Sequence, residues 1–218
     1  MKDKDWLVAL TGLAFVVLVI IAFAIGGEPP DPTDDSIEEV IEFYVDNKDS
    51  VFAGSIIAGF AGAFLVFFGG YLRKVLRAAE GEGHMLSSVV LAGATILAIG
   101  IAIDATINIA LSEGADADQV APEAIQALSL LWTNDFVPLA MGNLVFILAA
   151  GISIVRHGAL PAWLGWVAIV LGVVSMTPVG FFAFLVGGIW IAVVSIMLAM
   201  RARAAGTPGA PPPASGPA

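Results

Sequence analysis

The stretch LSSVVLAGATILAIGIAIDATINIAL, from Leu86 to Leu111, decides the class of this protein. It is longer than the roughly 20 residues with which an α-helix crosses the ~30 Å hydrocarbon core of a bilayer. It contains a single ionisable residue, Asp104. A run this long and this apolar is typical of a transmembrane helix rather than of a helix in a water-soluble domain.

The composition of the whole chain supports the same class. Of its 218 residues, 59% are hydrophobic and 13% are charged, whereas about 25% are charged in an ordinary soluble domain. Cysteine is absent, which excludes disulfides, thiolate metal sites and a cysteine nucleophile. We therefore expect an all-α, polytopic membrane protein.

Six apolar runs are long enough to be considered as transmembrane helices. They cover about residues 6–25, 51–72, 86–111, 136–155, 162–176 and 181–200. The fifth run is the shortest, and it reaches the length of a span only if Leu160 and Thr177 are included. We predict one six-helix bundle over residues 1–203. An Ala/Pro/Gly tail over residues 204–218 cannot build a core, and we expect it to be a disordered cytoplasmic segment.

The basic residues set the predicted orientation. The chain has nine lysines and arginines, and all except Lys48 fall on one side of the predicted membrane: Lys2, Lys4, Arg73, Lys74, Arg77, Arg156, Arg201 and Arg203. The positive-inside rule then predicts a multi-pass protein of the cell membrane with both termini in the cytoplasm. The opposite side carries the acids of Glu28–Asp49 and Glu113–Asp135.

The first helix has an alternative interpretation as a cleaved signal peptide. Lys2 and Lys4 precede its apolar run, and the AFA of Ala22–Ala24 resembles a signal-peptidase site. The run is longer than the apolar core of about 7 to 15 residues in a typical signal peptide, which favours a retained helix.

Each of the two outer loops is predicted to contain a short amphipathic helix. In DSIEEVIEFYVDNKD (Asp35–Asp49), Ser36 and Glu39 have the spacing of a capping box. In PEAIQALSLLW (Pro122–Trp132), proline suits the first helical position. These helices are expected to lie on the bundle or in the outer interface; the alternative is a lid or a partner-docking surface. Tyr44 and Trp132 suit the outer interface, where aromatic anchors gather.

The chain lacks the catalytic side chains that several classes of membrane enzyme require. Metalloproteases and serine proteases need histidine at membrane depth, whereas His84 and His157 fall in loops on the basic side. An aspartyl protease needs two facing acids, and Asp104 is the only acid within a predicted span. We expect no enzyme, no catalytic residue, no metal and no cofactor.

Asp104 is the residue that needs an explanation, because an acid in an apolar helix is costly. It lies about 27 Å from the inner end of its helix, with Asn108 one turn further out. Asn143, seven residues into the fourth predicted span, is expected at similar depth. One interpretation of Asp104, Asn108 and Asn143 is a polar clamp between the third and fourth helices. The other is a proton- or substrate-binding group in an outward-open cavity.

Small residues at four-residue spacing, such as Gly54, Ala58 and Gly62, favour close helix packing within one chain or self-association between chains. The first functional hypothesis is an accessory or structural bundle that docks a protein partner. The alternative is a small-molecule or ion transport element with an outward-facing polar site at Asp104. The lipid bilayer is an expected partner, and nucleic acid is not.

Two segments resemble a family. LPAWLGWVAIVLGVVSM (Leu160–Met176) is similar to the basic loop and Trp-containing helix entry of a group of bacterial multi-pass membrane proteins that carry a domain-of-unknown-function label. Phe43–Gly81 is similar to the second span and basic stop of the same group. The resemblance covers about a quarter of the chain. It implies a six-helix membrane protein and brings no functional residues with it.

Overall fold

The computed structural model describes residues 4–82, 85–177 and 179–206. Within these ranges the chain is helical and contains no strand, which confirms the predicted all-α class. The described helices are α1 (Asp5–Ala9), α2 (Thr11–Gly26), α3 (Ile37–Asp46), α4 (Lys48–Glu80), α5 (Leu86–Ala115), α6 (Pro122–Thr133), α7 (Phe136–His157), α8 (Ala162–Val174) and α9 (Gly180–Gly206). Helix α9 enters the predicted tail by three residues, and residues 207–218 of that tail lie outside the described ranges.

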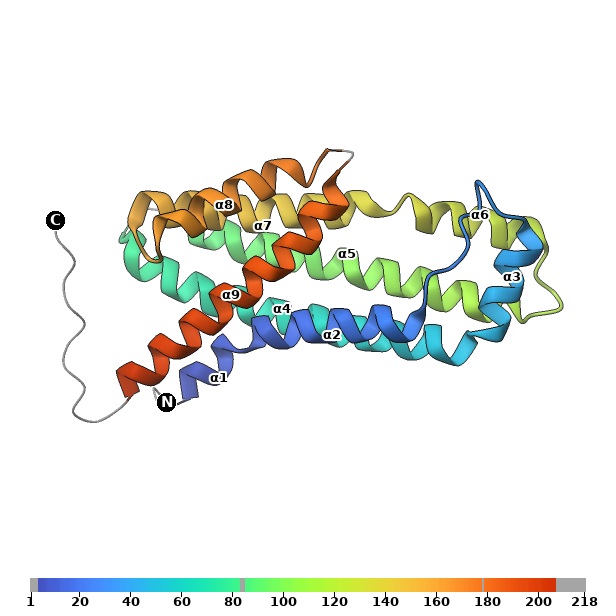
Figure 1. Ribbon diagram of the computed structural model, residues 1–218, viewed down its shortest axis with the longest axis horizontal. Helices are drawn as coiled ribbons and strands as arrows, with labels where there is room; N and C mark the ends of the chain where they lie inside the picture. Colours follow the sequence, from blue (N-terminus) through green and yellow to red (C-terminus); the bar gives the residue numbers. More distant parts are fainter. Residues whose placement is uncertain (1–3, 83–84, 178, 207–218) are drawn as a thin grey trace.

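The molecule is an elongated bundle (Figure 1). Helices α2, α4, α5 and α7 run along its long axis, and α6 continues the line of α7. Helix α4 packs between α2 and α5, and α5 packs between α4 and α7. Helix α8 packs on α7, and α9 crosses the bundle obliquely to contact α1. The first helix and the end of the last helix therefore lie at the same end of the bundle.

Glycines set the register between α5 and α7. A Cβ atom added at Gly93 would lie 2.3 Å from the Phe146 nitrogen, and one at Gly142 would lie 2.4 Å from the Leu97 nitrogen. Gly100 lies against Leu139 in the same way. As α5 advances from residue 93 to 100, its partner on α7 retreats from 146 to 139. This antiparallel register places residue 104 opposite residue 135, and residue 96 opposite residue 143.

The predicted stripe on α4 packs inside the chain. Gly54 lies against the Ala22 carbonyl of α2, and Gly62 lies against Ala98 of α5. Glycine allows the backbones to approach in this way. Lipid provides no hydrophobic driving force for helix association, so helices in a membrane depend on such close packing. These residues are therefore used for contacts within the bundle.

The first apolar run is broken at Leu10, between α1 and α2. The Ser195 hydroxyl of α9 accepts a hydrogen bond from the Leu13 nitrogen (2.9 Å) and donates one to the Ala9 oxygen (2.7 Å). In an unbroken helix, the Leu13 nitrogen would donate directly to the Ala9 oxygen. A side chain inserted into this ladder bends a helix. Ser195 thereby fixes α1 and α2 to α9.

Helices α3 and α6 pack onto the last turns of α5. Ser36 and Glu39 form the predicted capping box of α3. C-terminal to this cap, Val40 and Tyr44 of α3 are buried in a second apolar cluster with Ile107, Leu111 and Ile125. The two short helices lie on the bundle itself, at the end opposite to α1 (Figure 1). Their apolar faces extend the core beyond the long helices.

Among the described residues, five helical segments are long and apolar enough to cross a membrane: α1 with α2, α4, α5, α6 with α7, and α9. These five segments are compatible with a helical membrane protein, and their apolar surfaces suggest contact with lipid. The fifth predicted span is helical only over the 13 residues of α8. At 1.5 Å per residue it measures about 20 Å, shorter than the ~30 Å hydrocarbon core, so its length alone does not make it a span.

The end of the bundle near α1 buries an acid that the sequence analysis did not single out. Glu80, at the end of α4, is 4% exposed, and its Oε1 accepts a 2.6 Å hydrogen bond from the Ser153 hydroxyl of α7. Ser87 of α5 lies beside the same carboxylate. His157 belongs to the last turn of α7 rather than to a loop and is half-buried, whereas His84 lies outside the described residues. Glu80 therefore joins three helices.

Candidate functional site

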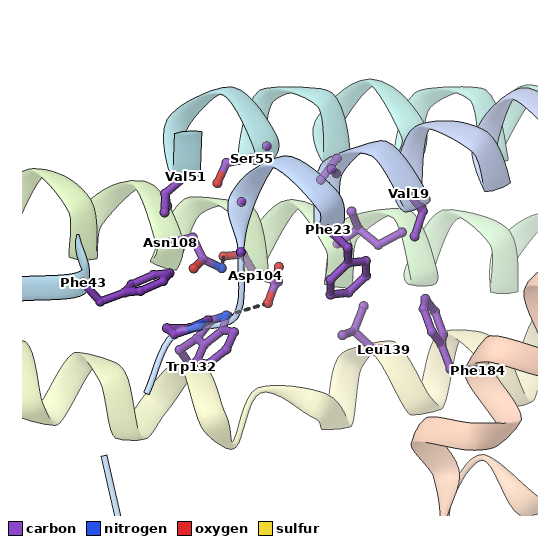
Figure 2. A pocket seen from close by; sticks show the side chains of 17 residues that line it. Val19, Phe23, Phe43, Val51, Ser55, Asp104, Asn108, Trp132, Leu139 and Phe184 are labelled. Atoms are coloured by element: carbon purple, nitrogen blue, oxygen red, sulfur yellow. Dashed lines mark hydrogen bonds between the residues drawn. The ribbon is translucent and has the colours of Figure 1, made fainter. Parts of the chain in front are cut away.

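A cavity of about 140 Å³ lies in the half of the bundle that carries α3 and α6. Its walls come from α2, α3, α4, α5, α6, α7 and α9 together with the segment after α2. Most of the lining is apolar. The side chains with polar atoms are Ser55, Asp104, Asn108 and Trp132. Figure 2 shows them on one side of the cavity, with Val19, Leu139 and Phe184 on the other.

Asp104 lies on the wall of this cavity and is half-buried. Its Oδ1 accepts a 2.9 Å hydrogen bond from the indole Nε1 of Trp132, which belongs to α6 (Figure 2). Among the described residues, no hydrogen bond reaches the second carboxylate oxygen, Oδ2. Asp104 thus has one oxygen held by the protein and one available to a molecule in the cavity.

Asn108 stands one turn further along α5 and also lines the cavity. Its side-chain nitrogen donates to the backbone oxygen of Asp104 (3.2 Å), and its oxygen accepts from the Tyr44 hydroxyl of α3 (3.4 Å). Burial, with a smaller contribution from the Asp104 carboxylate, raises the pKa of Tyr44 well above its ordinary value. The Tyr44 hydroxyl therefore stays protonated and remains a donor to Asn108, which positions this amide beside Asp104.

Asn143 does not belong to the same site. It is 1% exposed, does not line the cavity, and its side chain lies against Gly187 of α9. The register of α5 and α7 places it opposite residue 96, two turns of helix away from Asp104. The structure therefore brings Asp104 and Asn108 together and leaves Asn143 apart. Its Nδ2 atom is buried without a hydrogen-bond partner among the described residues.

Asp135 is the residue opposite Asp104 in this register. It precedes α7 directly, is half-buried, and is close enough to Asp104 for the two carboxylates to repel each other. Its Oδ2 is buried and has no hydrogen-bond partner in the part of the chain that the structure describes. Sequence reasoning assigned Asp135 to an outer loop, because it stands one residue before the fourth predicted span. The spacing of glycines on α5 and α7 was the signal that pairs it with Asp104.

The cavity combines a carboxylate with hydrogen-bonding groups and aromatic walls. Among the described residues, no lysine, arginine or histidine lines it, and no group of three His, Cys, Asp or Glu side chains is arranged to hold a metal ion. Such a site can accept hydrogen bonds from a bound molecule or neutralise a positive charge. Its apolar walls suit a small organic molecule, since a dry cavity of roughly 150 Å³ accommodates a benzene ring.

Comparison of the chain with protein-family models, curated proteins and solved structures gave no match. The resemblance at Leu160–Met176 and Phe43–Gly81 therefore stays a prediction. The cavity and the chemistry of its lining are therefore the features that indicate a function.

Proposed function

We propose that the protein crosses the cell membrane six times, with both termini in the cytoplasm. Helix α8 is the sixth membrane-inserted element, and the exposed Trp163 and Trp166 in its first turns suit a membrane interface. Among the described basic residues, all except Lys48 belong to the end of the bundle where α1 begins and α4, α7 and α9 end (Figure 1). The positive-inside rule favours this end as the cytoplasmic one.

We further propose that the bundle binds a small organic molecule in the Asp104 cavity, as a transport or carrier element. The observation that carries this proposal is the position of Asp104 on a cavity wall. A residue that only clamped α5 to α7 would be sealed between those helices. Instead, Asp104 bonds to α6, and the remainder of its carboxylate borders the cavity. A largely apolar pocket with a few convergent polar groups is the usual form of a small-molecule site. We assign no catalytic role to it.

The experiment compares the wild type with Asp104→Asn in liposomes of defined lipid. Asn keeps the size and hydrogen-bonding capacity of the side chain but removes its charge. We expect uptake of organic solutes to fall at least tenfold in Asp104→Asn, while the thermal unfolding temperature changes by a few degrees at most. Asp118→Asn, which alters an exposed acid outside the cavity, is the matched control. Equal uptake by all three proteins together with lower thermal stability of Asp104→Asn would favour the clamp.

Docking of a protein partner on the acidic end of the bundle is a second candidate function. The observation in its favour is the exposed acidic face of α3, which carries Glu38, Glu42 and Asp46. A photoreactive side chain at position 42 tests it in native membranes. A salt-sensitive cross-link to another protein supports docking, and a cross-link to a second copy of this chain supports self-association. Cross-linking to lipid alone contradicts both.

A further inference from the structure

We infer that the ligand of the Asp104 cavity is a small amphiphilic organic cation. Its ammonium head lies beside the free oxygen of Asp104, and its apolar tail lies between α2, α7 and α9. This inference rests on the proposed binding function and adds the chemical class of the ligand to it.

The charges around the cavity select a cation. Asp104 is the ionisable side chain in the lining, and no basic residue of the described chain lines the cavity beside it. Asp135 adds a second acid at the same level, and it repels Asp104 rather than neutralising it. A carboxylate in an apolar environment is costly unless a positive charge pairs with it. An ammonium group supplies that charge, whereas a phosphate or carboxylate ligand would add a further negative one.

The aromatic side chains support the same head group. Trp132 donates to Asp104 through its indole nitrogen, so its ring is held next to the carboxylate. Phe43 and Phe23 line the cavity from α3 and α2, and Figure 2 shows Phe43 on the same side as Trp132. Aromatic faces beside an anion are the arrangement that recognises substituted ammonium groups, because the ring quadrupole attracts a cation.

The opening of the cavity fits an amphiphile that arrives from the bilayer. Phe23 of α2 lines the cavity and is 61% exposed, so this wall of the cavity reaches the apolar outer surface of the bundle. Leu139 of α7 and Phe184 of α9 add further apolar lining.

The polarity of the lining fixes the orientation of the bound molecule. Asp104, Asn108 and Trp132 occupy the side toward α3 and α6, and Val19, Leu139 and Phe184 occupy the side toward α9 (Figure 2). A head group drawn to the first set leaves its tail against the second. A molecule with two charged ends has no polar partner at the apolar side, so the cavity selects a monocation.

The test uses two molecules of the same shape. Phenyltrimethylammonium and tert-butylbenzene differ in the replacement of a charged nitrogen by carbon. Their binding to the full chain in nanodiscs of zwitterionic lipid is measured by ligand-observed saturation-transfer NMR and by equilibrium dialysis. Empty nanodiscs correct for partition into lipid. We expect the wild type to bind the cation at least tenfold more tightly than the neutral isostere.

Variants test whether the Asp104 carboxylate causes the preference for the cation over the neutral isostere. Asp104→Asn is expected to weaken binding of the cation at least tenfold and to leave binding of tert-butylbenzene unchanged, whereas Asp118→Asn changes neither. Equal affinities of the wild type for the two molecules would overturn the cation assignment and leave the small-molecule site standing. Binding of neither molecule by the folded wild type would overturn the cation assignment, and failed solute uptake in the liposome assay would overturn the binding function as well. The comparison within the wild type remains decisive even if Asp104→Asn does not fold.

Discussion

The indole nitrogen of Trp132 lies 2.9 Å from Oδ1 of Asp104, and this hydrogen bond joins α6 to α5 at the wall of the cavity. It holds the carboxylate in place while leaving its second oxygen toward the interior. Trp132 was expected as an anchor in the outer interface. In the structure, its ring forms part of the cavity lining, and its polar atom positions the acid.

Removal of this hydrogen bond alone is expected to destabilise the protein modestly. Trp132→Phe keeps an aromatic ring but loses the indole donor, and hydrogen bonds between helices in membranes are worth about 1 kcal/mol. Thermal unfolding in detergent measures the change. Trp163→Phe is the control, because Trp163 is 57% exposed on α8 and its loss is expected to cost little. Equal losses in the two variants would contradict a structural role for the Trp132–Asp104 bond.

The glycine contacts between α5 and α7 predict a large difference between two alanine substitutions. Gly93→Ala places a methyl group 2.3 Å from the Phe146 backbone nitrogen, so the helices must separate, at a cost of at least about 2 kcal/mol. Gly59→Ala on α4 meets no atom within 4 Å and is expected to stabilise its helix by up to about 1 kcal/mol. Chemical unfolding curves of the two variants provide the comparison. Similar effects would show that the α5–α7 register is not fixed by these glycines.

Ser195 is expected to control the break in the first helix. Ser195→Ala removes the hydroxyl that satisfies the Leu13 nitrogen and the Ala9 oxygen, and leaving such buried groups unpaired costs about 1–3 kcal/mol. Hydrogen exchange at the Leu13 amide should accelerate in this variant. Ser88→Ala, at an exposed serine of α5, is expected to change neither exchange nor stability. Unchanged exchange at Leu13 in Ser195→Ala would contradict the inserted hydroxyl.

Glu80 is expected to contribute strongly to stability at the end of the bundle near α1, away from the Asp104 cavity. Glu80→Ala leaves the buried Ser153 hydroxyl without its acceptor and opens space between α4 and α7, at a combined cost of about 2–3 kcal/mol. Glu82→Ala, two residues along in an exposed turn, is expected to be neutral. Thermal unfolding of the two variants measures the difference. A neutral Glu80→Ala would show that this carboxylate does not hold the three helices together.

The length and apolarity of the runs were enough to predict where most of the helices form. The capping box at Ser36 and Glu39 was also readable, because its geometry is local. The break at Leu10 was not, since the hydroxyl that produces it comes from Ser195 at the other end of the chain. The shortness of α8 was readable, since the run over residues 162–176 was the shortest of the six and the helix covers Ala162–Val174.

The candidate site was predicted in part. Asp104 and Asn108 are one turn apart on one helix, so their proximity followed from helical periodicity. The predicted depth of Asn143 was wrong because it was counted from the start of the fourth predicted span. Helix α5 extends beyond the level of that start, where it packs against α6. The same count placed Asp135 outside the bundle. To predict which residues of two helices lie opposite each other, their register must be known. The register depends on side-chain contacts that a hydropathy profile does not contain.

The Ser195 contact also bears on the order in which the bundle assembles. A ribosome completes the first helix long before it makes α9, because synthesis runs from the N-terminus. Until Ser195 arrives, the Leu13 nitrogen and the Ala9 oxygen lack the hydroxyl that joins them in the folded bundle. We therefore expect the junction between α1 and α2 to take its final shape late in biogenesis, when the last helix of the bundle packs against the first.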